Sequence, residues 1–86
     1  MKNLEKILKA LANRRRLAIV AYLKKSGEAP VWEIADAIHL SFKATSKHLG
    51  ILAAADIVER EQRILQMFYR LAGGQKAVVK HILADL

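Results

Sequence analysis

The side chains best suited to chemistry in this sequence are cationic and hydroxyl groups gathered in its middle third. Ser41, Lys43, Ser46 and Lys47 lie within a few positions of one another. At helical spacing the last three share one face. A lysine on such a face donates to guanine O6 or N7, and a serine hydroxyl reaches a base or a phosphate. A solvated helix face has the same composition, so the meaning of the pattern depends on the elements that carry it.

Arginines form a second cationic group shortly after the first. Arg60 and Arg63 stand beside Glu59 and Glu61 in a charged stretch. Arginine is suited to phosphates and to a narrow minor groove, whereas neighbouring glutamates would simply pair with it. Arg63 is the better placed for a nucleic-acid contact, because we expect it near the tip of a hairpin.

Other kinds of site are poorly supported. His81 and Asp85 lie one helical turn apart, but two ligands are too few for a closed zinc site of about four. The sequence has no cysteine, which excludes disulfides and thiolate chemistry. It also has no glycine-rich phosphate loop, no Gly-x-Ser-x-Gly and no His-Glu-x-x-His. We therefore expect no metal site, no cofactor and no enzymatic activity.

Length and composition describe a single small domain that spans residues 1–86. The chain has 86 residues, a net charge of +7 and 53% hydrophobic residues, which is too apolar for a disordered chain. The charge favours an anionic partner. The longest apolar run, Leu17 to Leu23, is far shorter than the ~20 residues of a membrane span. The segment MKNLEKILK lacks a signal-peptide core, so we expect a cytoplasmic protein without a membrane partner.

Hydrophobic periodicity predicts helices before and after the cationic region. An apolar stripe indicates a helix at about 4–12, and Asn13 is a suitable cap for a second helix whose apolar centre would be buried. A third short helix follows Pro30. Residues 75–86 carry the apolar stripe of a last helix.

The middle of the chain predicts a helix-turn-helix followed by a hairpin. A tight turn at 39–41 separates the short helix from a helix between Ser41 and Ala55, with Ser41 as its cap. Alternating residues in 57–60 and 67–71 then indicate two strands. The fold class is mainly α with a small β-hairpin, in the order helix-helix-helix-helix-hairpin-helix. This is a winged helix-turn-helix, with the helix-turn-helix at about 31–55 and the wing at about 57–71.

The segment LSFKATSKHLGILAAADIVER resembles the arsenic-repressor (ArsR) family of winged-helix transcription regulators. The recurring pattern is Leu-Ser, then Ser-x-His-Leu-x-x-Leu, then Ile-Val, and it is found here from Leu40 to Val58. LKALANRRR resembles the opening segment of the family, and Phe-Tyr-Arg-Leu at 68–71 resembles its exit strand. The resemblance runs from about Leu4 to Leu71. It implies a dimeric, DNA-binding repressor in which His48 lies near the DNA backbone; packing at the helix edge is the alternative for that residue.

Three departures from the family pattern affect the expected site. Metal sensors of the family carry a Cys-x-Cys motif in or before the third helix, where this chain has Pro-Val-Trp-Glu. His39 replaces the glycine of the turn, a position that histidine tolerates at positive φ. Ile64 replaces the glycine of the wing tip, so the wing is expected to be longer or differently bent. The resemblance thus implies a repressor without a metal sensor site, and any small-molecule effector stays unknown.

The apolar stripes of the first and last helices exceed what one thin core is expected to cover. Pairing of these helices across a two-fold axis would bury them, as the resemblance also implies, and would demand a palindromic double-stranded operator. The alternative is that both stripes pack within one monomer. The expected dimer-interface residues are Leu4, Ile7, Leu8, Leu11, Val78, Val79, Ile82, Leu83 and Leu86.

The expected DNA-binding residues are Ser41, Lys43, Ser46, Lys47, His48, Arg60 and Arg63. The main alternative is a winged-helix interaction module that binds an acidic protein through the same lysines. RNA binding is a weaker alternative, because the sequence lacks the aromatic pairs typical of single-strand stacking.

Overall fold

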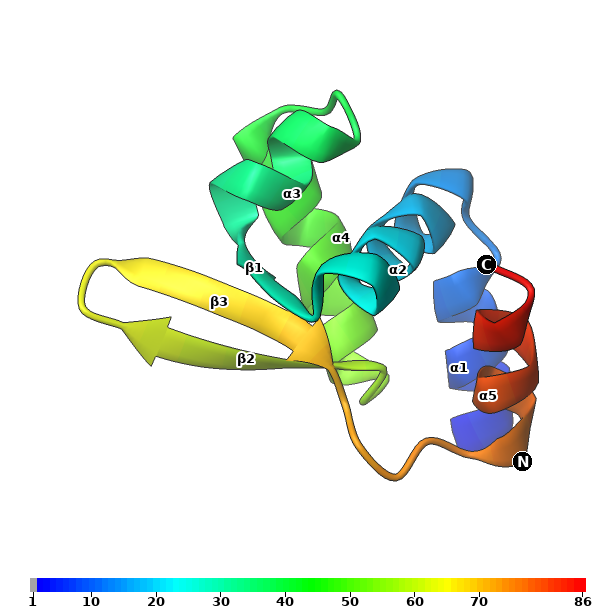
Figure 1. Ribbon diagram of the computed structural model, residues 1–86. Coiled ribbons are helices and arrows are strands. Elements are labelled where there is room, and N and C mark those ends of the chain that lie inside the picture. The colour runs from blue at the N-terminus through cyan, green and yellow to red at the C-terminus, as the bar shows by residue number, and fades with distance from the viewer. Residues whose placement is uncertain (1) are drawn as a thin grey trace.

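A computed structural model describes residues 2–86 of the chain. Five helices and a small sheet follow one another in the order given by the ribbon in Figure 1. The elements are α1 (Lys2–Leu11), α2 (Arg14–Ser26), β1 (Glu28–Pro30), α3 (Val31–Ala37), α4 (Phe42–Ala54), β2 (Val58–Arg63), β3 (Gln66–Leu71) and α5 (Ala77–Ala84).

Helix α2 is the centre of the core. It begins after Asn13, whose side chain accepts hydrogen bonds from the backbone N–H groups of Arg15 and Arg16 and so caps two otherwise unpaired donors. Ile19 and Val20 are fully buried in it. The cap predicted from the sequence is confirmed, and the predicted buried run is confirmed only in part, because Ala18 is exposed while Ile19, Val20 and Leu23 are buried. At the other end Gly27 stops the helix at φ 86°, which only glycine adopts freely.

Helices α3 and α4 form the helix-turn-helix. The turn between them passes through His39 at φ 55°, so the expected left-handed residue is confirmed. The Oγ of Ser41 then accepts a hydrogen bond from the backbone N–H of Ala44 at 3.1 Å, which fixes the start of α4. Together these two residues set the angle at which α4 leaves the turn.

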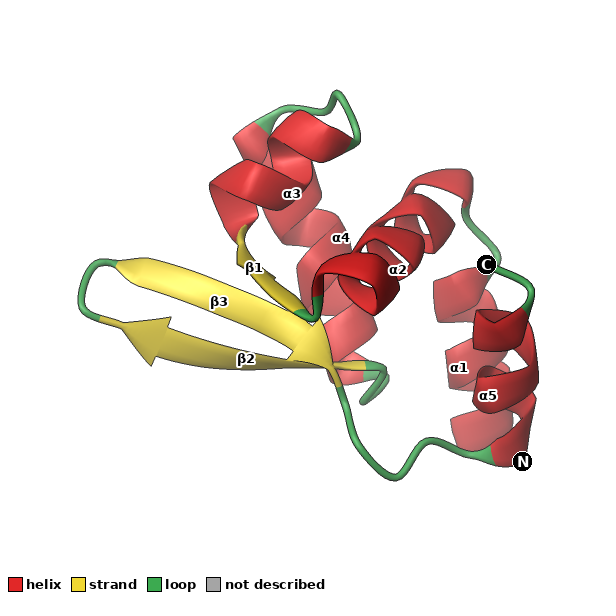
Figure 2. Ribbon diagram, viewed as in Figure 1, coloured by secondary structure: helices red, strands yellow, loops and turns green. Residues whose placement is uncertain are grey.

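The sheet has three strands in the order β1-β3-β2, all antiparallel, with two long strands and one short one in Figure 2. The sequence predicted only the hairpin. Strand β1 pairs its three residues with Arg70, Tyr69 and Phe68 of β3. Its three residues are too few to show an alternating pattern, and the strand is fixed by β3, a partner distant in the sequence, as in the pair of Ala29 with Tyr69. The hairpin thus becomes the outer part of a sheet that is tied to the start of α3.

The tip of the wing is a two-residue connection, Ile64–Leu65, between paired Arg63 and Gln66. Ile64 has φ 53°. The longer wing that the missing glycine suggested is not found at the tip: the connection is a tight turn, and an isoleucine occupies a left-handed backbone conformation in it.

Helices α1 and α5 lie at the end of the molecule away from the wing tip (Figure 1). Both pack against α2, and Lys24 Nζ donates to the carbonyl of Leu83 at 2.7 Å to hold the end of α5. No helix in the part of the chain that the structure describes is long and apolar enough to cross a bilayer.

Candidate nucleic-acid interface

Helix α4 has one face for the core and one for solvent. Thr45, Leu49 and Leu52 are fully buried on the inner face. Lys43 and Lys47 are exposed on the outer face, with Ser46 half-buried beside them. Within residues 2–86, no carboxylate lies within salt-bridge distance of either lysine. The structure therefore brings together the three residues that the sequence placed on one face, and leaves both amines available.

Ser41 occupies the N-terminus of this face. Its hydroxyl oxygen accepts from the Ala44 N–H, while its hydroxyl proton is still free to be donated. The positive end of the helix dipole is at the same place. The arrangement suits a phosphate oxygen next to the first turn of α4.

His48 lies at the edge of α4 and binds another residue of the protein. Its Nδ1 is 3.1 Å from Nη1 of Arg16, which therefore donates to it. Arg16 also donates from Nε to the carbonyl of Ala10 at 2.5 Å, and so links the end of α1 to α4. Burial lowers the pKa of the His48 imidazole, and the charge of Arg16 lowers it further. Both effects favour the neutral ring, and the hydrogen bond from Arg16 favours the tautomer whose Nδ1 is unprotonated.

Arg63 is held by carboxylates of the protein. Its guanidinium forms a two-bond pair with Glu28, at 2.7 and 2.9 Å, and donates to Glu61 at 3.1 and 3.2 Å. It also lies over the ring of Phe68, 4.5 Å from the ring centre. The hydrogen bond from Arg63 lowers the pKa of Glu61. A DNA phosphate can therefore contact this arginine only in competition with two carboxylates.

Arg60 lies on the other face of the wing. Side chains alternate along a strand, so Arg60 shares the face of buried Val58, and Arg63 shares the face of Glu59 and Glu61. Arg60 and Gly50 of α4 line the same open hollow. Arg60 is exposed, and no carboxylate among residues 2–86 is within salt-bridge distance of it. Of the two predicted wing arginines, Arg60 is the one beside α4.

The predicted dimer stripes divide into two sets. Ile7, Leu11 and Val79 are 7%, 4% and 0% exposed, because they belong to the core of the single chain. Because these three side chains are already buried within the single chain, a partner could cover little more of them, and they are not carried into the proposed interface. Leu8 and Leu86 are 43% and 44% exposed. The remaining predicted residues are half-buried: Leu4, Val78, Ile82 and Leu83.

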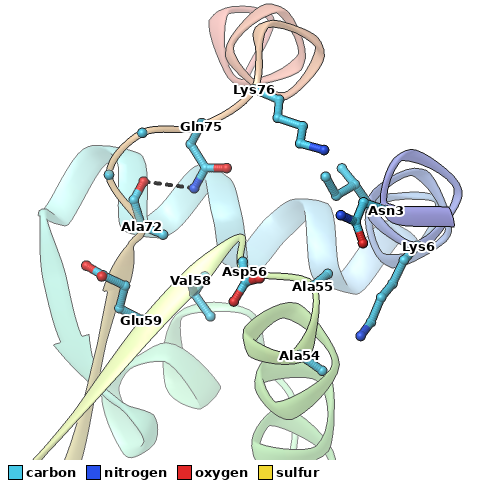
Figure 3. Close-up of a pocket in the computed structure, with 13 residues that line it drawn as sticks. Asn3, Lys6, Ala54, Ala55, Asp56, Val58, Glu59, Ala72, Gln75 and Lys76 are labelled. Carbon is cyan, nitrogen blue, oxygen red and sulfur yellow. Dashed lines mark hydrogen bonds between the residues drawn. The ribbon is translucent and has the colours of Figure 1, made fainter. Parts of the chain in front are cut away.

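A polar cavity of about 340 Å³ lies on the α1 and α5 side of the molecule (Figure 3). Lys6 and Lys76 come from those two helix regions, and Asp56 and Glu59 from the start of the wing. Gln75 closes one wall by donating to the carbonyls of Ile57 and Ala72 at 2.9 and 2.8 Å. Within the described part of the chain, no three His, Cys, Asp or Glu residues come together as a metal site would require. His81 and Asp85 accordingly remain without a third ligand there.

The sequence reasoning did not single out an apolar surface beside α4. Trp32, Phe42, Ile64 and Leu65 are all largely exposed. Trp32 Nε1 donates to Oε1 of Gln66 at 3.3 Å, so the start of α3 touches the wing. Phe42 and Leu65 line one small hollow although they are far apart in sequence. The sequence does carry a sign of this surface: these apolar residues do not belong to the apolar stripes that their own elements turn toward the core.

Comparisons with known proteins agree with this geometry. The family described as "Bacterial regulatory protein, arsR family" matches residues 13–60. The HTH-type transcriptional repressor SmtB of Mycobacterium tuberculosis is 40% identical over 79 residues, which are 92% of this chain and 56% of that protein. The chain thus spans about half the length of that repressor. The transcriptional activator HlyU of Vibrio cholerae is 35% identical over 75 residues, or 86% of this chain and 68% of that protein.

A solved structure shows the same fold. The solution structure of the homodimeric winged helix-turn-helix DNA-binding domain Mb0332 of Mycobacterium bovis, a possible ArsR-family regulator, has a TM-score of 0.85 at 30% identity. The match covers 98% of this chain and 75% of that one. The winged helix-turn-helix inferred from the sequence is confirmed, and so is the family resemblance. The chain is a member of the ArsR family of bacterial regulatory proteins.

Proposed function

We propose that the protein is a sequence-specific transcription regulator that binds double-stranded DNA as a homodimer and represses by occupying an operator. The observation that carries the proposal is the outer face of α4. Lys43 and Lys47 extend from the second helix of a helix-turn-helix. Both are exposed, and no carboxylate among residues 2–86 lies within salt-bridge distance of them. In this fold that helix lies in the major groove.

Each element then has a part in binding. Lys43, Ser46 and Lys47 read base edges, and Ser41 binds a phosphate at the start of α4. Arg60 supplies the charge of the wing. Arg63 makes a weaker phosphate contact, because it must first give up a hydrogen bond to Glu28 or Glu61. His48 positions α4 through Arg16 and lies at the edge of the DNA-binding face.

The dimer places two such faces on one duplex. Leu8 and Leu86, both partly exposed, form with Leu4, Val78, Ile82 and Leu83 an apolar surface on α1 and α5. Pairing of these surfaces about a two-fold axis sets two α4 helices about 34–36 Å apart, which is one turn of DNA, and requires a palindromic operator. Support comes from the homodimeric state of the Mycobacterium bovis domain.

Repression is supported by the SmtB relative, although HlyU is an activator. Both relatives are transcription regulators, so we assign no enzymatic activity and place the protein with DNA in the cytoplasm. We propose no zinc-sensing site, because the described residues of one chain bring no third ligand to His81 and Asp85.

Selection of bound duplexes from a random pool tests the DNA proposal. We expect a palindrome with half-sites one helical turn apart. Affinity should fall with salt at a slope of about −0.9 per phosphate contact. An equal affinity for the selected duplex and for shuffled sequence would contradict it, and preferential binding to an acidic peptide would favour the interaction-module alternative.

Sedimentation tests the dimer. Leu8→Glu and Ile82→Glu place charge on the shared apolar surface, so both should give monomers that bind the palindrome far more weakly. Leu65→Glu adds the same charge to an exposed leucine at the wing tip, and it should remain a dimer. A wild-type chain that stays monomeric at high micromolar concentration, or a Leu8→Glu variant that still dimerises, would contradict the assigned interface.

A further inference from the structure

The tip of the wing is the most exposed apolar point among the described residues. Ile64 is 94% exposed and Leu65 is 91% exposed. The two residues connect β2 and β3 at the end of a hairpin that projects away from α1, α2 and α5 (Figure 1). Isolated surface leucines are ordinary, but two adjacent large apolar side chains at the end of a projecting arm have no folding role in the chain itself.

The backbone at this tip is strained in a way that glycine would avoid. Ile64 has φ 53°. A β-branched residue is strongly disfavoured in the left-handed region, and such outliers gather at binding sites. The chain therefore retains an apolar side chain at a position where its removal would relax the backbone.

The arm behind the tip is braced. Arg63, the residue before Ile64, is fixed by Glu28 of β1 at 2.7 and 2.9 Å and stacks on Phe68. Gln62 Nε2 donates to the carbonyl of Ile64 at 3.2 Å. The carboxylate partners also neutralise Arg63, so the tip itself presents apolar surface with little free charge.

The tip lies beside the proposed DNA-reading helix. Leu65 lines a small hollow with Phe42, the first residue of α4, and with Trp32 at the start of α3. Lys43 follows Phe42 directly, and Arg60 supplies an exposed charge on the wing. A ligand that reaches both α4 and the tip must therefore offer anionic groups to the cations and apolar surface to Ile64 and Leu65. A DNA duplex offers both, in its phosphates and in the faces of its bases.

We propose that Ile64 and Leu65 form an apolar wedge that enters the minor groove next to the half-site and partly unstacks one base step, so that binding kinks the DNA. This rests on the proposed function and adds to it the way in which the wing selects sequence. Apolar wedges from other proteins kink DNA by about 20–90°. Pyrimidine–purine steps unstack most easily, so the wedge selects such a step at a position where no base edge is read.

The test uses the selected palindromic duplex with 2-aminopurine placed in turn at each step flanking a half-site. Wild-type protein should raise the fluorescence at one step and shorten the end-to-end distance measured by energy transfer. The double variant Ile64→Gly, Leu65→Ser should abolish both signals. Its affinity should fall by roughly tenfold, since lost apolar burial is partly offset by deformation no longer needed.

Two measurements separate the wedge from a merely structural role. Ile64→Gly relaxes the backbone, so the thermal midpoint of the double variant should equal or exceed that of the wild type. Its salt slope should be unchanged, because no phosphate contact is lost. The matched variant Arg60→Ala keeps the wedge and removes a charge; it should reduce the salt slope by about 0.9 and keep the fluorescence signal of the bound complex.

The outcomes distinguish the two proposals. Tight, sequence-specific binding by the wild type with no fluorescence change at any step and a straight duplex would overturn the wedge and leave the DNA-binding function standing. A double variant that bends and unstacks DNA as the wild type does would also overturn the wedge. Failure of the wild type to prefer any duplex would overturn both.

Discussion

Helix α4 and the wing both carry cations, but α4 leaves both of its lysines unpaired, whereas in the described part of the wing only Arg60 is without a carboxylate partner. Lys43 and Lys47 are exposed and lie on a helix without a single carboxylate. In the wing, Arg63 binds Glu28 and Glu61, and Arg70 binds Glu59 and Glu61. The number of cations on an element therefore does not determine the electrostatic field that the element presents to DNA.

The difference follows from the periods of the two elements. Along a helix, residues three or four apart share a face, so a segment without acids presents an unpaired cationic face. Along a strand, every second residue shares a face, which brings Glu59, Glu61 and Arg63 together. The neighbouring strand then adds Arg70 opposite Glu59. Counting arginines and lysines along the sequence overstates the charge of the wing for this reason.

Removing one lysine of α4 is expected to give the largest effect. Lys47→Ala should weaken binding to the selected operator by about 10-fold to 100-fold, because a bidentate base contact discriminates by ~1–3 kcal/mol. Binding to random duplex should weaken far less. Titration of both duplexes at one salt concentration measures the difference, and equal losses on both would show that Lys47 binds only phosphate.

The wing arginines offer a direct comparison. Arg60→Ala should reduce the salt slope by about 0.9 and leave stability unchanged. Arg63→Ala should lower the free energy of unfolding only slightly, since its ion pairs are partly solvated at 38% exposure. Its salt slope should change less than that of Arg60→Ala, because a phosphate must compete with Glu28 and Glu61 for Arg63. Urea titrations and DNA titrations of both variants provide the measurements, and a slope change for Arg63→Ala equal to that for Arg60→Ala would break the contrast.

The inner face of α4 provides a control for its outer face. Thr45 is fully buried, and its Oγ1 has no hydrogen-bond partner among the described residues. Thr45→Val keeps the shape and removes the unpaired hydroxyl, so the free energy of unfolding should rise by about 1 kcal/mol. DNA affinity and salt slope should be unchanged. If Thr45→Val weakened operator binding without lowering the free energy of unfolding, the inner face of α4 would also contribute to DNA recognition.

Acidification is expected to have the smallest effect, at the edge of α4. The pKa of His48 is lowered in the folded protein by burial and by Arg16. The folded state therefore binds fewer protons than the unfolded chain, and stability falls as the pH drops below the usual imidazole pKa of about 6.5. His48→Gln should flatten this dependence in urea titrations between pH 7.5 and 5.5. An equally steep fall in the variant would assign the effect to other groups.

Local signals predicted much of the fold. Asn13 and Ser41 cap the helices that follow them, and the turn residue His39 adopts the expected positive φ. The two faces of α4 also followed from spacing alone. These features depend on residues within a few positions of one another, so a single sequence contains the information.

Features set by distant partners were not predictable. Strand β1 exists because β3 pairs with it. Arg63 is neutralised by Glu28, 35 residues away, and that contact depends on the sheet register. The apolar residues of α1 and α5 divide between the core and the surface according to how those helices are rotated against α2. Ile7 and Leu8 are neighbours in sequence, yet one is buried and the other exposed.

The sheet order also determines how the protein avoids self-association through its strands. With β3 in the middle, β1 and β2 are the two edges. Strand β1 is only three residues long and ends in Pro30, which has no N–H to offer another strand. Strand β2 has an open edge, but its sequence VEREQR carries alternating charges that would meet like charges in any copy added in register. The charges of β2 thus also disfavour strand-to-strand association of the projecting hairpin.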